Sequence, residues 1–331
     1  MKHLFVTGMM AATLVFGTPA LAKDVALNLS NEYSAVSIHG VGDARFAEAV
    51  KSATNGSVDI VVHYGGALGY KSADHFDAVG EGALAIADTY SGALGGIDPL
   101  FLISSLPFLA TTVEEARTLY EVSKADIEKV FADNDQILLY ASPWPPSGLW
   151  ARDPMNNLAA LSGVKIRTFD KNSTEALSEA GAAAIRLSWG DVVPSISTGA
   201  IEAVLTTAET GAGASFWEYF DTFTEIYGYS MPLNYVHMNK DVFDSLTKDQ
   251  QDAILSAAEK TSDANWSAIP SRLKETYAQL KTNNVDVVTS DDETYRAELQ
   301  AAGKVAIDSW LAATGDRGQA LLDAFYKASS H

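Results

Sequence analysis

Residues 161–210 read LSGVKIRTFDKNSTEALSEAGAAAIRLSWGDVVPSISTGAIEAVLTTAET, and this stretch decides the fold that we expect. Three short apolar runs, at residues 164–168, 183–187 and 201–205, predict parallel strands around two helices. In such a β-α-β-α-β unit, the residues that leave the carboxyl end of each strand line one crevice. The stretch therefore predicts a binding crevice at the ends of these strands.

Four side chains leave the predicted strand ends. Arg167 lies near the end of the first run, Trp189 follows the second, and the third is followed by Thr206 and Thr207. A guanidinium offers a planar fork of N–H donors that matches a carboxylate bidentately, and it stays charged when water is removed. One cation, one large flat ring and two hydroxyls predict a site for a small organic anion.

Capping-box patterns, in which a side chain that caps a helix start is followed three residues later by Glu or Gln, predict where several helices begin. The pairs are Thr112 with Glu115, Asn172 with Glu175, Thr247 with Gln250, and Ser290 with Glu293. Gly181 is typical of a helix stop. The long helix that begins at Thr247 is expected to be interrupted near Pro270 and to resume to Lys281.

Strand and helix patterns alternate along the first part of the chain, with expected strands at residues 24–30, 58–63, 84–88 and 137–141. This alternation indicates an α/β lobe with a mostly parallel sheet. Three prolines within residues 142–148 predict a stiff extended crossing to a second α/β lobe. A strand at residues 229–239 is expected to return to the first lobe.

Residues 1–22 have the pattern of a secretory signal peptide. Lys2 opens a short basic region, residues 4–17 form an apolar core, and Ala-Leu-Ala at residues 20–22 is a small-residue cleavage site before Lys23. A membrane anchor is the alternative, but the apolar run is too short to span a bilayer. We therefore expect an exported, periplasmic protein that is not inserted in the membrane.

The chain of 331 residues contains no cysteine and carries 42 acidic against 23 basic residues. Loss of Lys2 with the signal peptide would give the mature protein a net charge of −20. Such a surface repels nucleic acid, so no nucleic-acid partner is expected. It also repels an anionic ligand at long range. The binding site must therefore be locally positive, which makes Arg167 more necessary.

Several short motifs occur in a characteristic order. Gly-Val-Lys-Ile-Arg ends at Arg167, Ser-Trp-Gly-Asp occupies residues 188–191, and Ser-Thr-Gly-Ala-Ile-Glu-Ala occupies residues 197–203. Gly-Ala-Leu-Gly at 66–69 and Leu-Pro-Phe at 106–108 precede them. In order and spacing, nearly the whole chain resembles the solute receptors of tripartite ATP-independent periplasmic (TRAP) transporters.

The resemblance implies a two-lobe α/β fold of the periplasmic binding protein class (type II-like), with a ligand cleft between the lobes and long C-terminal helices. Closure of the lobes by hinge bending would enclose the ligand. Lobe I is expected at residues 23–143 plus about 229–268, and lobe II at 144–228 plus about 269–331. The implied partners are a small organic acid and the membrane permease subunits. We expect a monomer without a cofactor.

The resemblance also assigns roles to individual residues. Arg167 matches the arginine that clamps the ligand carboxylate, and Trp189 matches an aromatic residue that packs on the ligand. Thr206 takes the place of a ligand-binding asparagine, with Thr207 as the alternative because the alignment leaves a one-residue gap. Asn31, at the end of the first strand, matches an asparagine position that often contacts ligand.

Departures from the family pattern bear on the ligand. Ser147 stands where many members have a second arginine, and Trp144 and Trp150 flank it. Tyr70 and Tyr90 replace acids that occur in members that bind hydroxylated ligands. One cation among several aromatic faces favours a planar monocarboxylate such as benzoate or hydroxybenzoate. A four-carbon dicarboxylate, a sugar acid or another aliphatic carboxylate is the alternative.

An exported enzyme acting on a carboxylated substrate is the competing class of function. The sequence shows no nucleophile–base pair, and the histidines at positions 39, 63, 75 and 237 lack metal-ligand spacing. We therefore expect a binding protein rather than an enzyme, with no catalytic residues, no bound metal and no cofactor.

Overall fold

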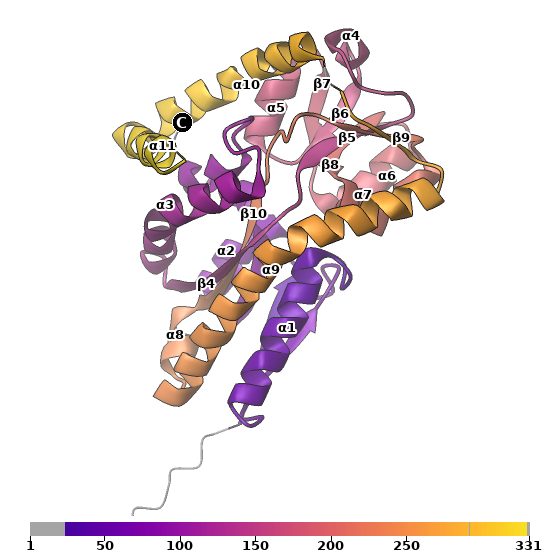
Figure 1. The fold of residues 1–331 in the computed structure, drawn as a ribbon. Coiled ribbons are helices and arrows are strands. Elements are labelled where there is room, and N and C mark those ends of the chain that lie inside the picture. Colours follow the sequence, from indigo (N-terminus) through magenta and orange to yellow (C-terminus); the bar gives the residue numbers. More distant parts are fainter. Residues whose placement is uncertain (1–23, 291, 330–331) are drawn as a thin grey trace, which may run out of the picture.

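A computed structural model describes residues 24–290 and 292–329 and contains two sheets, each flanked by helices (Figure 1). The expected signal peptide lies outside the described residues. No helix within the described ranges is both long enough and apolar enough to cross a bilayer.

The first sheet has the strand order β2-β1-β3-β10-β4. Its strands are β1 Val25–Asn31, β2 Val58–His63, β3 Ile86–Tyr90, β4 Gln136–Pro143 and β10 Leu233–Asn239. β1 pairs in parallel with β2 and β3, whereas β10 lies antiparallel between β3 and β4. The predicted return of the chain to the first sheet is therefore confirmed. We call this sheet, with the α-helices of residues 38–132 on it, lobe I.

The second sheet has the order β11-β9-β5-β8-β6-β7. Its strands are β5 Ser147–Ala151, β6 Lys165–Thr168, β7 Ala183–Arg186, β8 Ala203–Thr207, β9 Thr222–Glu225 and β11 Asp286–Val288. β6 pairs in parallel with β7 and β8, as the opening stretch of sequence predicts. We call this sheet, with the α-helices of residues 158–213, lobe II.

The helices cover the two sheets and connect them. Their bounds are α1 Ile38–Ala53, α2 Ser72–Gly80, α3 Val113–Ala132, α4 Leu158–Leu161, α5 Lys171–Glu179, α6 Val192–Ser197, α7 Ala208–Gly213, α8 Lys240–Asp244, α9 Lys248–Thr282, α10 Glu293–Thr314 and α11 Asp316–Ala328. Short 3-10 segments are η1 Ser91–Leu94, η2 Pro99–Ser105, η3 Trp189–Asp191 and η4 Phe216–Glu218. α10 packs against α5 and α11 packs against α3, so the C-terminal helices touch both lobes.

Three segments run between the lobes. The proline-rich segment joins β4 to β5, and a second connection joins β9 to β10. The third is α9, which packs against α1 and β4 near its start and against α7 and β11 further along (Figure 1). The predicted crossing at the prolines is therefore confirmed.

Helix α9 corrects one expectation, because it continues through Pro270 without interruption. A proline inside a helix removes a hydrogen bond and costs about 3 kcal/mol. Trp266 and Ile269, in the turn before it, are both buried in the lobe I core. We attribute the intact helix to this burial, because breaking the helix there would expose both side chains.

Two predicted helix starts are also displaced. α5 is capped by Asp170, whose carboxylate accepts from the Ser173 amide, rather than by Asn172. Asn172 instead donates to the Leu102 carbonyl from a buried position. α10 is capped by Asp292 rather than by Ser290. The capping boxes at Thr112 and Thr247 are confirmed.

Candidate functional site

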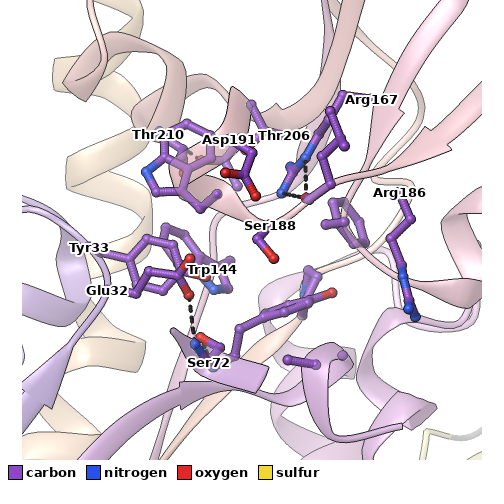
Figure 2. A pocket seen from close by; sticks show the side chains of 18 of the residues that line it. Glu32, Tyr33, Ser72, Trp144, Arg167, Arg186, Ser188, Asp191, Thr206 and Thr210 are labelled. Atoms are coloured by element: carbon purple, nitrogen blue, oxygen red, sulfur yellow. Dashed lines mark hydrogen bonds between the residues drawn. The ribbon is translucent and has the colours of Figure 1, made fainter. Parts of the chain in front are cut away.

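A cavity of about 330 Å³ lies between the carboxyl ends of the strands of the two lobes. Lobe I contributes residues that follow β1 and β3, and lobe II contributes residues from the ends of β6, β7 and β8. Figure 2 shows side chains that converge on this space from both sides. The volume suits a ligand of one small ring or a short chain.

Arg167 is held in the cavity wall by backbone carbonyl groups. Its Nε and Nη2 donate to the Leu187 carbonyl at 3.1 and 2.9 Å, and its Nη1 donates to the Leu205 carbonyl at 3.3 Å. The side chain is 5% exposed, and no acidic group of the described chain lies within ion-pair distance of it. A guanidinium has five N–H donors. One donor on each terminal nitrogen therefore remains for a ligand carboxylate.

The electrostatic surroundings of Arg167 suit an anion. Burial lowers the pKa of the guanidinium, and nearby Tyr33, Tyr90 and Glu32 act in the opposite direction. Arginine remains charged even when its pKa is lowered by a few units. The Arg167 carbon Cζ lies 5.7 Å from the ring centre of Trp189, which shields one side of the guanidinium from water. The cavity wall thus holds a fixed, dehydrated positive charge.

Aromatic rings form much of the remaining wall. Tyr33 and Trp144 meet edge to face, with ring centres 4.7 Å apart, and Tyr90 meets Phe169 similarly at 5.9 Å. The Trp144 Nε1 donates to the Asn234 Oδ1 at 2.8 Å, which fixes the orientation of that ring. Rings held in this way offer flat apolar surfaces to a ligand.

The Tyr90 hydroxyl is committed to a protein partner. It donates to the Asp170 Oδ2 at 3.0 Å, and both groups are buried. Burial and the adjacent Asp170 carboxylate raise the pKa of Tyr90. Because its only hydrogen is directed at Asp170, Tyr90 presents its ring, and not a hydroxyl donor, to the cavity.

Both candidate threonines line the cavity, but their hydroxyls differ. Thr207 caps α7, because its Oγ1 accepts from the Thr210 amide at 3.0 Å. The Thr206 hydroxyl makes no hydrogen bond within the described part of the chain. Thr206 is therefore the hydroxyl that is free for a ligand, and Ser147 lies on the neighbouring strand β5, opposite Thr207.

Asn31, Tyr70 and Trp150 do not line the cavity. Asn31 is fully buried, and its Oδ1 accepts from the Tyr33 amide at 2.6 Å, so it supports the wall from behind. Tyr70 packs against a small apolar cluster beside α2. Trp150 points to the opposite face of β5, where it packs on Phe216.

Several lining residues were not singled out from the sequence: Glu32, Tyr33, Ser72, Phe169, Arg186, Ser188, Asp191, Thr210 and Pro232. Glu32 and Tyr33 directly follow β1, and Phe169 directly follows β6. The rule that strand ends line the crevice could have found these three. Arg186 lies at the end of β7 and is exposed at the cavity rim (Figure 2).

Two ion pairs lie beside the cleft between the lobes. Lys71 and Asp191 meet at 3.1 Å, and both side chains are about half exposed. Arg272 of α9 meets Glu209 of α7 at 2.7 Å in a more buried position. The same Glu209 carboxylate accepts from the Ile38 amide at the start of α1. Asp191 and Glu209 of lobe II therefore contact lobe I at two places, through Lys71 and through the Ile38 amide.

Two α/β lobes, three crossing segments and a cleft with one buried arginine define a solute receptor. The chain belongs to the bacterial extracellular solute-binding proteins, family 7, whose pattern matches residues 29–312. It is a receptor of the TRAP transporter type with the two-lobe fold expected from the sequence. Proteins of this family are substrate-binding receptors of transporters and not enzymes.

Solved structures and curated relatives agree with this assignment. A Bordetella pertussis extracytoplasmic solute receptor binding pyroglutamic acid is 28% identical, with a TM-score of 0.87 and coverage of 91% of this chain and 99% of that one. A marine metagenome TRAP solute-binding protein specific for pyroglutamate is 27% identical, with a TM-score of 0.86 and coverage of 92% and 99%. The ectoine-binding periplasmic protein of Halomonas elongata is 25% identical over 291 residues, which cover 85% of this chain and 84% of that one.

Proposed function

We propose that this receptor captures a small monocarboxylate with a flat ring and delivers it to the TRAP permease. The observation that carries the proposal is the state of Arg167, whose two remaining N–H donors belong to different terminal nitrogens and face no protein acid. A carboxylate would complete both bonds at once. The ring of the ligand would lie between the aromatic faces of the two lobes.

Two ring types compete for this site. The first is an aromatic acid of the benzoate or hydroxybenzoate type, which the abundance of aromatic walls favours. The second is a cyclic amide such as pyroglutamate, favoured by relatives that bind it at 26–28% identity. The commitment of the Tyr90 hydroxyl to Asp170 removes one donor that a hydroxybenzoate could have used, so unsubstituted rings fit better.

Titration calorimetry of the mature protein, from residue 23 onward, tests the proposal. The panel contains benzoate, 4-hydroxybenzoate, pyroglutamate, succinate and galactonate, and we expect the ring-bearing monocarboxylates to bind most tightly. Micromolar binding corresponds to about −8 kcal/mol. Two hydrogen bonds to a charged group, at roughly 1.5–3 kcal/mol each, would supply much of it. The proposal fails if only succinate or galactonate binds, and Arg186 at the rim would then be the second cation to test.

A further inference from the structure

Glu32 is an acid in the wall of a cavity built for an anion. It follows β1 directly, lines the cavity, and is 8% exposed. Its Oε2 accepts from the Ser72 amide, at the first residue of α2, at 2.9 Å. Its Oε1 has no hydrogen-bond partner among the residues that the structure describes. Figure 2 shows the Glu32 carboxylate directed at Ser72, with this hydrogen bond dashed.

A buried carboxylate oxygen without a donor is unusual, because buried polar groups are nearly always hydrogen-bonded. The Ser72 amide donates to only one of the two carboxylate oxygens of Glu32. The remaining oxygen has almost no accessible surface, so a ligand donor reaches it only when the carboxylate turns toward the cavity that Glu32 lines. The Glu32 charge also acts on Arg167, which places the two opposite charges around one small cavity.

An anionic ligand without a hydrogen-bond donor would be disfavoured in this cavity. Its carboxylate is attracted by Arg167, but the rest of it must lie close to a second negative charge. A ring N–H turned toward Glu32 reverses the sign of that contact. A ring oxygen in the same place would set lone pairs against a carboxylate, which binding sites reject strongly.

We propose that Glu32 is a specificity-determining residue that accepts a hydrogen bond from a ring N–H of the bound carboxylate. The preferred ligand class is therefore a nitrogen heterocycle that bears one carboxylate, and not a benzoate. This inference rests on the proposed capture of a ring-bearing monocarboxylate, and it narrows the choice between the two ring types.

The decisive experiment compares two ligands of the same shape. Pyroglutamate carries a ring N–H, and 5-oxotetrahydrofuran-2-carboxylate carries a ring oxygen in its place. For the wild-type receptor we expect the lactone to bind about 100-fold or more weakly by calorimetry. Equal affinities would overturn the role of Glu32. Proline and ectoine, whose ring nitrogens are charged, show whether a cationic donor serves as well as a neutral one. If pyroglutamate, proline and ectoine all fail to bind, the proposed role of Glu32 is also overturned.

Glu32→Gln provides the matched variant. The amide oxygen can still accept from Ser72, so the start of α2 keeps its contact, while the amide nitrogen turns the acceptor into a donor. We expect pyroglutamate to lose about 10–100-fold and the lactone to gain, so that the ratio between the two ligands collapses. A merely structural role would change both ligands equally and leave the ratio unaltered, which would refute the inference.

Failure of this inference can be told apart from failure of the proposed function. If benzoate and pyroglutamate both bind the wild type and Glu32→Gln weakens the binding of neither, Glu32 does not discriminate between ligands. The proposed capture of a ring-bearing monocarboxylate is then still supported. If no ring-bearing monocarboxylate binds and succinate does, the proposed function itself is wrong, and the role of Glu32 falls with it.

Discussion

The two walls of the cleft hold their side chains by different means. On the lobe II side, backbone carbonyls of neighbouring segments fix Arg167. On the lobe I side, side chains fix the rings: Trp144 donates to Asn234, and Asn31 accepts from the Tyr33 amide. Asp88 links the side chains of Asn31 and Asn234, because the side-chain amide groups of both donate to its carboxylate. A carbonyl group is supplied by any residue, whereas a side-chain network depends on residue identity and protonation.

This difference predicts that the lobe II wall contributes mainly affinity, and that the lobe I wall contributes stability as well. Arg167→Ala tests the contribution of the lobe II wall to ligand affinity, and it should have the largest effect of the variants. We expect affinity to fall by about 3–6 kcal/mol, since two hydrogen bonds to a charged group are lost. Calorimetry with the best ligand of the panel measures it.

Arg167→Lys is the matched control, because it retains the positive charge but lacks the planar fork. We expect it to recover part of the affinity and to unfold at nearly the wild-type temperature. Undiminished binding by Arg167→Ala would show that the carboxylate lies elsewhere in the cavity.

Trp144→Ala tests the lobe I half. The ring is buried, lies 3.9 Å from the His39 ring between centres, and carries the bond to Asn234. Removing it should lower the free energy of unfolding by about 3–5 kcal/mol, because a large cavity forms and a buried acceptor loses its donor. Denaturant unfolding of the ligand-free protein measures this.

Trp189→Ala, on the more exposed lobe II ring, should reduce affinity and leave stability nearly unchanged. A loss of stability in Trp189→Ala together with a loss of affinity alone in Trp144→Ala would contradict the comparison of the two walls.

The lobe I network should also respond to pH. Burial raises the pKa of Asp43 to about 7, and burial together with the Asp43 charge raises the pKa of its neighbour Asp88. An unfolded aspartate releases its proton near pH 4. Between about pH 4 and 7 the folded state thus holds protons that the unfolded state has lost. These acids therefore make the free energy of unfolding decrease as pH rises through that window.

Asp43→Asn replaces this acid with a neutral side chain of the same shape and should remove part of that slope. The expected change between pH 5 and 7 is at least about 1.4 kcal/mol, the equivalent of one pKa unit. Buried His39 and His237 have lowered pKa values and give a slope of the opposite sign below about pH 6.5, which the variant retains. Asp59→Asn, at an exposed ion pair, is the control, and an identical pH profile for both variants would exclude the buried acids as the cause.

The sequence predicted the lobe II wall better than the lobe I wall, and the contrast between the two explains why. Arg167 and Trp189 belong to one local β-α-β-α-β unit, so strand ends alone bring them together. The lobe I network joins Asn31 and Asp88, on the paired strands β1 and β3, to Asn234 on β10, which becomes a neighbour of β3 only when the chain returns to the first sheet. That pairing could be expected, but not the register that places these particular side chains face to face.

The sites that the sequence missed have a similar cause. Asn31 was assigned from the family resemblance, yet its side chain is buried in the core, and Glu32 and Tyr33, which follow the end of β1, lie at the cavity. Trp150 was placed beside the ligand because it flanks Ser147, but three residues along a strand reverse the face. The helix starts at Asp170 and Asp292 were also missed. Asp170 caps its helix two residues before the expected Asn172, and Asp292 caps its helix two residues after the expected Ser290.

The smallest effects concern the ion pairs that join the two walls. Arg272 also donates to the Val36 carbonyl, so Arg272→Ala breaks one partly buried link among α1, α7 and α9. We expect a shift of about 1–3 kcal/mol toward separated lobes, and a larger radius of gyration by small-angle X-ray scattering of the ligand-free protein. Lys71→Ala removes only a half-exposed pair, which contributes about 0–1 kcal/mol and is screened by salt. A larger expansion for Lys71→Ala than for Arg272→Ala would mean that the lobes are held together at the mouth of the cavity and not at the α9 side.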